Sequence, residues 1–478
     1  MRPTFTRAAA SAALFALVAG AVPAAANPTI VIDAASGETL VQQEATRPWY
    51  PASLTKLMTV FVALKAVREG RITLDTPLKV SARATTMAPS KMGFRPGTLV
   101  TLDNALKMLM VKSANDIAVT IAEGVSGSVE AFANEMNASA SALGMRESHF
   151  TNPNGLPDSR QVSSARDMAI LGRALYVYFP EQAGLFDIGA LRLGKRILPT
   201  HNGMLGRYPG ADGMKTGFTC AAGFNLVASA TQNGRRLIAV VLGAPSAKSR
   251  TMMAASLLDK GFVSGGGQGS VTSLGSSGGE APDMRDFACR NRGKASQEFE
   301  AQVEDMSAPI PRSFMAAAGA QGPEGHSPYG GGPAGGSPVA SGPMRPSQIA
   351  TLPRPAFQPV PVFVGPVAGW NGPIAHAQGD TATPVKQAYS PDGDEEAESP
   401  VKPAPDAQSM RGKRGAKAKV KAAKAAPAKA KAAKVEEDED EKPKAKAAKT
   451  RVAKAHEAKE KPGKAKAPKR RPKTDDDE

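Results

Sequence analysis

The chain has 478 residues and a formal net charge of +16, and its length alone would suggest about three domains. Residues 411–478 contain 24 Lys or Arg and 12 Asp or Glu, a net +12, so the rest of the chain is close to neutral. Two cysteines and five scattered histidines show no metal-ligand spacing, which argues against a metal site, and no cofactor is expected.

Residues 1–26 have the features of a secretory signal peptide. Arg2 and Arg7 form a positive head, residues 8–22 form a short apolar segment, and a run of three alanines offers a small-residue cleavage site. We therefore expect export to the periplasm or cell envelope, with the mature chain starting near Asn27. No other stretch approaches the length of about 18 apolar residues that a membrane span needs, so no transmembrane helix is expected.

The hydrophobic periodicity of a folded domain stops near Phe262. Residues 263–410 are rich in Gly, Pro, Ser and Ala, and residues 411–478 repeat Ala-Lys and Ala-Pro-Lys with almost no large apolar side chain. Such segments cannot bury enough surface to offset their ordering entropy. We therefore expect one globular domain at 27–262, followed by a Gly/Pro-rich disordered linker and a basic disordered tail.

Within the domain, strands are expected at both ends and helices between them. Residues 29–33 and 39–41, separated by Ala-Ser-Gly, predict an opening hairpin. Helical periodicity follows at 53–69, 102–110, 116–123, 129–143 and 166–178. Strand-like segments at 224–231 and 236–242 are joined through Asn-Gly, a strong hairpin signal, and a last helix is expected at 249–262. The order predicts an α+β fold in which N- and C-terminal strands form an antiparallel sheet covered by helices.

Ser53 and Lys56 stand at the start of the first helical segment. Positions i and i+3 lie on one helix face, so Lys56 could reach Ser53 Oγ. An N-cap serine followed by a lysine is also an ordinary helix start. A chain of this length should contain about two Ser-x-x-Lys pairs by chance, and a second one does occur at 399–402.

Two further short motifs follow in chain order. Ser113-Ala-Asn115 lies where one helical pattern breaks and another starts, and Lys215-Thr216-Gly217 precedes the Asn-Gly hairpin. Each alone is weak, because a helix cap and a turn use the same residues. The order Ser-x-x-Lys, Ser-x-Asn, Lys-Thr-Gly is typical of serine β-lactamases and penicillin-binding proteins.

The chain resembles the serine D-alanyl-D-alanine carboxypeptidases, the low-molecular-mass penicillin-binding proteins of peptidase family S11, over about residues 28–262. Residues 150–157, residues 163–168 and Ser249-Arg250 look like further family segments. The resemblance implies a β-lactamase/transpeptidase-like fold and a Ser53 acyl-enzyme. It also implies removal of the terminal D-alanine from peptidoglycan stem pentapeptides during peptidoglycan maturation, and acylation by β-lactam antibiotics.

The resemblance implies catalytic roles for three side chains. Ser53 is the nucleophile, Lys56 is its base, and Ser113 carries the proton to the leaving amine. A serine hydroxyl needs an adjacent base, and a lysine can serve only if burial or nearby positive charge lowers its pKa. By the same resemblance, the backbone N–H groups of Ser53 and Phe218 form the oxyanion hole. The family often has His where this chain has Phe218.

The resemblance also implies the substrate-binding residues. Asn115 hydrogen-bonds the peptide of the substrate, and Lys215 and Thr216 receive its C-terminal carboxylate with help from Arg250. Gly217 lets backbone and substrate approach closely.

Three other functions stay open as alternatives for a chain with this pattern: a DD-endopeptidase acting on crosslinks, a β-lactamase, and a non-catalytic envelope-binding protein. A β-lactamase commonly has a deacylating Glu on a loop before the Lys-Thr-Gly strand. Residues 153–165 contain no Glu, and Ser-Ala-Asn replaces the Ser-Asp-Asn of β-lactamases.

The basic tail and the cysteines each leave two readings. The tail is either a solvated spacer or a segment attracted to anionic envelope surfaces such as lipid, lipopolysaccharide or wall polymer. Nucleic acid is not an expected partner of an exported protein.

Cys220 and Cys289 either form a disulfide that ties the extension to the domain or remain two thiols.

Overall fold

The computed structural model describes residues 27–307 and 344–379. The predicted signal peptide and the basic tail lie outside the described residues, as does part of the predicted linker. Within the described ranges, every helix is too short or too polar to cross a membrane.

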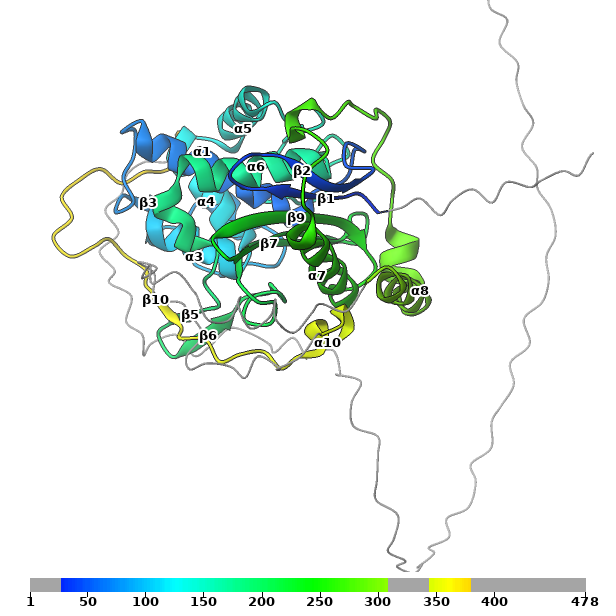
Figure 1. Ribbon diagram of the computed structural model, residues 1–478. Helices are drawn as coiled ribbons and strands as arrows, with labels where there is room; N and C mark the ends of the chain where they lie inside the picture. Colours follow the sequence, from blue (N-terminus) through cyan, green and yellow to red (C-terminus); the bar gives the residue numbers. More distant parts are fainter. Residues whose placement is uncertain (1–26, 308–343, 380–478) are drawn as a thin grey trace, which may run out of the picture. The chain divides into compact units, whose positions relative to one another are not determined.

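An antiparallel sheet forms the centre of the domain. Its strands are β1 (Thr29–Asp33), β2 (Thr39–Gln43), β7 (Ala211–Thr219), β8 (Gly223–Gln232) and β9 (Arg235–Ala244). They lie in the order β2-β1-β9-β8-β7 (Figure 1). Ile30 of β1 is opposite Val240 of β9. The predicted α+β fold, with a sheet built from N- and C-terminal strands, is confirmed. The predicted Asn-Gly hairpin is confirmed too, because Asn233 and Gly234 both have positive φ between β8 and β9.

Helices cover both faces of this sheet. Alternate residues of β9 enter two different hydrophobic clusters: Leu237 packs in the cluster of α7 (Ala247–Val263), and Ile238 packs in the cluster of α6 (Ala165–Tyr178). Because both faces are covered, β8 and β9 are buried along nearly their whole length.

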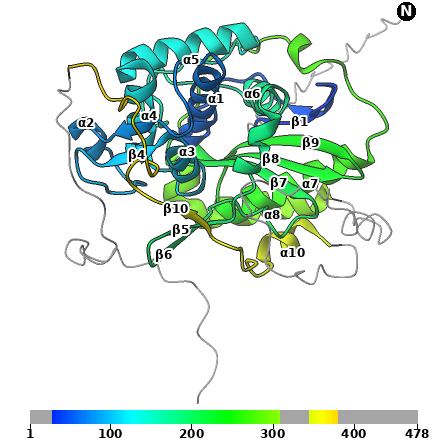
Figure 2. The ribbon, with the colours of Figure 1, turned by 90° about the vertical axis from the view of Figure 1, so that its left-hand side faces the viewer.

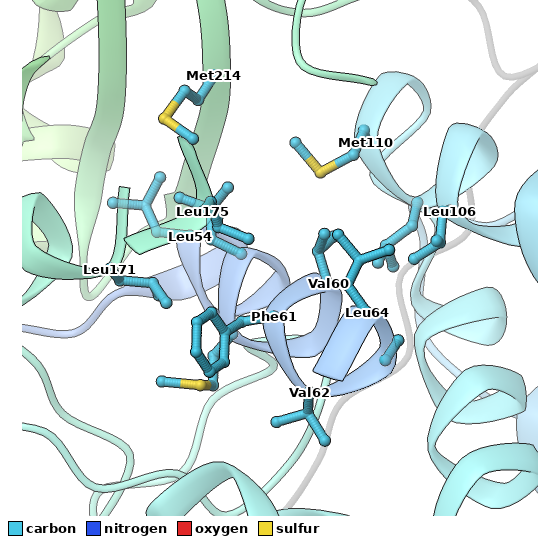
Figure 3. Packing of buried hydrophobic residues seen from close by; sticks show 14 of the residues in the cluster. Leu54, Val60, Phe61, Val62, Leu64, Leu106, Met110, Leu171, Leu175 and Met214 are labelled. Atoms are coloured by element: carbon cyan, nitrogen blue, oxygen red, sulfur yellow. The ribbon is translucent and has the colours of Figure 1, made fainter. Parts of the chain in front are cut away.

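The helical part of the domain surrounds α1 (Thr55–Arg68). The other helices of this part are α2 (Ala82–Thr85), α3 (Leu102–Val111), α4 (Asn115–Ser126) and α5 (Val129–Leu143). Side chains of α3, α6 and β7, including Leu106, Leu171 and Met214, gather around α1 (Figure 3). The helix is apolar on nearly every side, as a buried helix must be, so its N-terminal turn is held rigidly inside the domain.

Short elements that the sequence did not predict complete the domain. They are the strands β3 (Pro77–Lys79), β4 (Leu99–Thr101), β5 (Ala190–Leu193), β6 (Arg196–Pro199) and β10 (Val360–Val362), the 3₁₀ turns η1 (Ala52–Leu54), η2 (Pro180–Leu185) and η3 (Val271–Ser273), and the π turn η4 (Asp286–Arg290). β3 and β4 form a two-stranded sheet, and β5 pairs with both β6 and β10.

The prediction of a disordered linker from residue 263 onward is wrong for residues 264–307 and 344–379. These ranges contain α8 (Arg292–Asp305), α10 (Pro346–Thr351) and β10, and they lie against the domain (Figure 2). Several of their large apolar side chains are almost fully buried: Phe299 is 6% exposed, Val303 and Ile349 are 0% exposed, and Val360 and Val362 are 6% and 4% exposed. The average composition of the segment did not reveal these few residues. They bury the apolar surface that the linker was expected to lack.

A disulfide between Cys220 and Cys289 joins the end of β7 to η4. The structure thus favours the paired reading of the two cysteines. We call residues 344–379 the strap, because α10 packs on α7, β10 pairs with β5, and Gln378 reaches the end of α4 through a bond to Gly127 O.

Candidate active site

Ser53 lies in the turn η1, immediately before α1. The residue before it, Ala52, has φ +48°, a left-handed conformation that is unusual for a residue other than glycine. Asn225 of β8 stabilises this turn, because its side-chain amide donates to Tyr50 O at 2.9 Å and Pro51 O at 3.2 Å. Its oxygen accepts from Gly243 N at 2.8 Å. Asn225 was not predicted as a site residue, and nothing in its sequence context marks it.

Lys56 reaches Ser53 as predicted. Its Nζ lies 3.0 Å from Ser53 Oγ, 2.7 Å from Asn115 Oδ1 and 2.5 Å from Asn154 O. Lys56 is 0% exposed. Burial, and then the positive charge of Lys215, hold the pKa of Lys56 well below its ordinary value, although Asp116 opposes this shift. A neutral amine beside a serine hydroxyl is able to accept the hydroxyl proton.

The Ser113-Ala-Asn115 motif occupies the break between α3 and α4. Ser113 has φ +59°, and Asn115 is the first residue of α4. The Asn115 side chain accepts from Lys56 and donates to Ala88 O at 2.8 Å. Asp116, which was not predicted, accepts from the N–H groups of Met92 and Gly93. The motif therefore fixes the loop at residues 88–93 as well as Lys56.

The Lys215-Thr216-Gly217 motif lies on β7, at the edge of the central sheet. A Cβ on Gly217 would be 2.9 Å from Pro51 O and 3.2 Å from Ser53 N, so only glycine lets this strand approach the Ser53 turn. Lys215 is 2% exposed and donates to Thr216 O at 2.8 Å. Burial, and then the charge of Arg250, lower the pKa of Lys215 to about 7. Phe218 is 42% exposed and stacks on Phe224 at 4.1 Å between ring centroids.

Arg250 projects from the first turn of α7 toward the same strand. Its guanidinium donates to Asn225 O at 3.3 Å and to His201 O at 3.4 Å. It is 5% exposed, and its Nε is buried without a hydrogen-bond partner among the described residues. Burial, and then the charge of Arg354, lower the pKa of Arg250 to about 10, so it remains a cation at neutral pH.

A loop at residues 152–161 closes the other side of the Ser53 turn. Asn154 supplies the carbonyl that binds Lys56, and Gly155 has φ +82° with no room for a side chain: a Cβ there would be 1.9 Å from Ala52 O. Gln161 braces the loop by accepting from Thr151 N and Asn152 N. The sequence marks residues 150–157 only as a family segment and does not predict the contact of Asn154 with Lys56.

A cavity of about 300 Å³ adjoins the Ser53 turn. Its walls are Tyr50–Ala52, residues of the 155–161 loop, and Thr219 and Ala221 beyond the Lys-Thr-Gly motif; Asp283 and Arg285 add two charged side chains. The last two belong to the segment tied down by the disulfide, and they were not predicted.

The structure brings together most of the predicted site residues. Ser53, Lys56 and Asn115 are in hydrogen-bond contact, and Gly217 lies against the Ser53 turn. Within the described ranges, no hydrogen bond joins Ser113 or Thr216 to Ser53 or Lys56, and no group of three or more His, Cys, Asp or Glu is arranged to hold a metal ion.

Residues 16–246 match the peptidase S11 family, D-alanyl-D-alanine carboxypeptidase. The D-alanyl-D-alanine carboxypeptidase DacF of Bacillus subtilis is 35% identical over 241 residues, which are 50% of this chain and 62% of that protein. DacB2 of Mycobacterium tuberculosis is 32% identical over 259 residues, 51% of this chain and 86% of that protein.

A solved structure of penicillin-binding protein D2 from Listeria monocytogenes, in its cefotaxime-bound form, is 31% identical. The likeness has a TM-score of 0.46 and covers 50% of this chain and 97% of that one. The chain spans about three fifths of the length of the first curated relatives it matches.

Proposed function

Because the chain belongs to the peptidase S11 family of D-alanyl-D-alanine carboxypeptidases, we propose that it is a serine-type D-Ala-D-Ala carboxypeptidase acting on peptidoglycan stem pentapeptides. The contact between Ser53 Oγ and Lys56 Nζ carries the proposal. Lys56 is fully buried and its pKa is depressed. Its other hydrogen bonds to described residues go to an amide oxygen and a backbone carbonyl, neither of which would hold it in the charged form as a carboxylate would.

In the acylation step, Ser53 Oγ attacks the carbonyl carbon of the penultimate D-alanine while Lys56 Nζ takes the hydroxyl proton. Negative charge then develops on the substrate oxygen. We assign its stabilisation to the backbone N–H groups of Ser53 and Phe218, because Gly217 brings β7 against Ser53 N. One such donor is typically worth about 3 kcal/mol in the transition state.

The bond to the terminal D-alanine breaks next. The leaving nitrogen needs one proton, which Lys56 gives up through the Ser113 hydroxyl. The terminal D-alanine departs as a free amine, and the rest of the peptide remains as an ester on Ser53. Water then attacks the ester, Lys56 takes a proton from the water, and Ser53 Oγ recovers its proton as the shortened peptide leaves.

Substrate binding uses the residues around Lys215. The C-terminal carboxylate of the substrate would bind between Lys215, the Thr216 hydroxyl and Arg250, which are two cations and a donor. Asn115 already uses its oxygen on Lys56 and one N–H on Ala88 O, so one N–H remains for the substrate peptide. The cavity beside Ala52 offers room for the acyl side of the stem peptide.

β-Lactams are proposed as covalent inhibitors that acylate Ser53. The Listeria relative was solved with cefotaxime bound, which supports this proposal by analogy. We also propose that residues 1–26 direct the chain to the periplasm or cell envelope. The Cys220–Cys289 disulfide supports this, because disulfides persist in oxidising compartments.

The test is D-alanine release from a purified stem pentapeptide by the full mature chain. We expect release by the wild type, and none by Ser53→Ala or Lys56→Met. A crosslinked muropeptide offered in parallel separates this activity from a DD-endopeptidase. Cleavage of the crosslink without release from the pentapeptide would replace the carboxypeptidase proposal with the endopeptidase.

A further inference from the structure

The strap crosses the loop that leads from β5 to the Lys-Thr-Gly strand. A Cβ on Gly206 would be 2.2 Å from Pro355 Cγ, and one on Gly189 would be 2.1 Å from the Phe357 ring. β10 then lies beside β5 (Figure 2), with Val360 paired in parallel with Leu191. These contacts fix the backbone that follows residue 354 against β5 and the loop before the Lys-Thr-Gly strand.

Arg354 of the strap reaches this wall directly. Its Nη1 donates to Thr200 O at 3.1 Å, and the next carbonyl along the chain, His201 O, accepts from Arg250 at 3.4 Å. Two consecutive carbonyls therefore hold two arginines that are more than one hundred residues apart in sequence. Arg250 in turn lies close enough to Lys215 to depress its pKa.

The cations gathered here lack acidic partners. Among the described residues, Arg207, Arg250 and Arg354 form no ion pair, and the Nε atoms of Arg207 and Arg250 are buried without a hydrogen-bond partner. In contrast, Arg345 of the same strap pairs with Glu304 at 3.7 Å. Burial, and then the neighbouring cations, Arg354 among them, lower the pKa of His201 to about 4. Positive charges that are left unpaired at such short range repel one another, and an anion bound among them relieves this repulsion.

We propose that Arg354 is a further substrate-binding residue, which the strap supplies to the pocket that receives the terminal carboxylate of the substrate. The inference rests on the proposed function and adds a specificity residue that lies beyond the family domain. Arg354 is exposed, whereas Lys215 and Arg250 are buried. Its charge should attract and retain the carboxylate equally in the ground state and the transition state, so it should act on KM and leave kcat unchanged.

The experiment compares the full mature wild type with Arg354→Gln and Arg354→Lys. Lys65→Gln serves as the matched control, because this substitution also removes one exposed cation. Lys65 lies nine residues along α1 from Lys56, roughly 13 Å away. At low ionic strength, Arg354→Gln should raise KM for a stem pentapeptide by about three- to fivefold with kcat unchanged. The difference should shrink in high salt, and Arg354→Lys should retain most of the wild-type KM. A pentapeptide with an amidated C-terminus should be cleaved equally by Arg354→Gln and wild type.

Two results would overturn the inference while leaving the proposed function intact. One is an active wild type whose KM does not change in Arg354→Gln at low salt. The other is a rise of KM in Arg354→Lys as large as that in Arg354→Gln, or an equally large rise in Arg354→Gln when the peptide is amidated. Either rise would show that Arg354 acts through packing and not through its charge. Absence of D-alanine release by the wild type would overturn both the proposed function and this inference.

Discussion

The proposed mechanism needs opposite protonation states of two buried lysines. Lys56 must be neutral to accept a proton from Ser53, whereas Lys215 must be charged to bind a carboxylate. Burial lowers the pKa of both, and each is flanked by a further cation. In the proposed mechanism, desolvation makes Lys56 a base, and the same desolvation limits the pH range in which Lys215 can bind substrate.

This pair predicts a pH dependence of kcat/KM. Activity should rise with pH as Lys56 loses its proton, at a pH below that of an ordinary lysine, and it should fall above about 7 as Lys215 loses its charge. The falling limb should appear mainly in KM, because Lys215 acts in binding. Kinetics of D-alanine release between pH 5 and 10 would show both limbs. In Lys215→Arg the falling limb should move to higher pH, and a limb that stays in place would show that another group titrates.

Two glycines with similar φ angles make it possible to test the effect of a steric clash separately from the effect of backbone strain. Gly155 has φ +82° and faces Ala52 O, while Gly144 has φ +75° and has open space around it. Gly144→Ala should cost about 1 kcal/mol of stability and leave kcat unchanged. Gly155→Ala adds a clash with the Ser53 turn, so kcat should fall at least about tenfold. Thermal unfolding and D-alanine release measure the two effects; equal kcat values in the two variants would show that the 155 loop does not position Ser53.

At the scale of elements, the strap is the largest departure from the sequence prediction. Ile349 of α10 is 0% exposed in the cluster formed by α7 and the central sheet. Ile349→Ala should therefore destabilise the domain by about 2–4 kcal/mol, whereas Thr351→Ala on the exposed side of the same helix should change stability little. Denaturant unfolding of the two variants tests the packing. If Ile349→Ala unfolds like wild type, the strap does not belong to the folded domain.

Elements with a strong period or turn signal were predictable. The hairpin β1–β2, the helices α1 and α3 to α7, and the Asn-Gly hairpin follow from local pattern, and the contact of Ser53 with Lys56 follows from helix geometry. The short strands β3 to β6 and β10 have three or four residues each, too few for a period to show. Asn225 and Asn154 act through bonds to distant backbone, which no local pattern records.

At the scale of the whole molecule, a covalent link holds the extension to the catalytic domain. The Cys220–Cys289 disulfide closes a loop with a sequence separation of 69. Cys220→Ser with Cys289→Ser should lower the free energy of unfolding by about 2–4 kcal/mol. Denaturant unfolding with and without reductant tests this; a wild type that is insensitive to reductant would argue that the disulfide contributes no stability.

The basic tail at residues 411–478 is not expected to take part in catalysis. Deletion of residues 411–478 should leave D-alanine release unchanged and weaken retention on anionic envelope fractions, more so at low salt. Sedimentation of the full and shortened chains with such fractions compares the two. Equal retention would leave the tail as a solvated spacer.

The central claim is that Ser53 is an acylating nucleophile activated by Lys56. The most direct measurement is the intact mass of the mature chain over time with benzylpenicillin, for the wild type and for Ser53→Ala. We expect a long-lived adduct of one drug molecule on the wild type and none on Ser53→Ala. No adduct on the wild type, an equal adduct on Ser53→Ala, or an adduct that vanishes rapidly as the drug is consumed would contradict it.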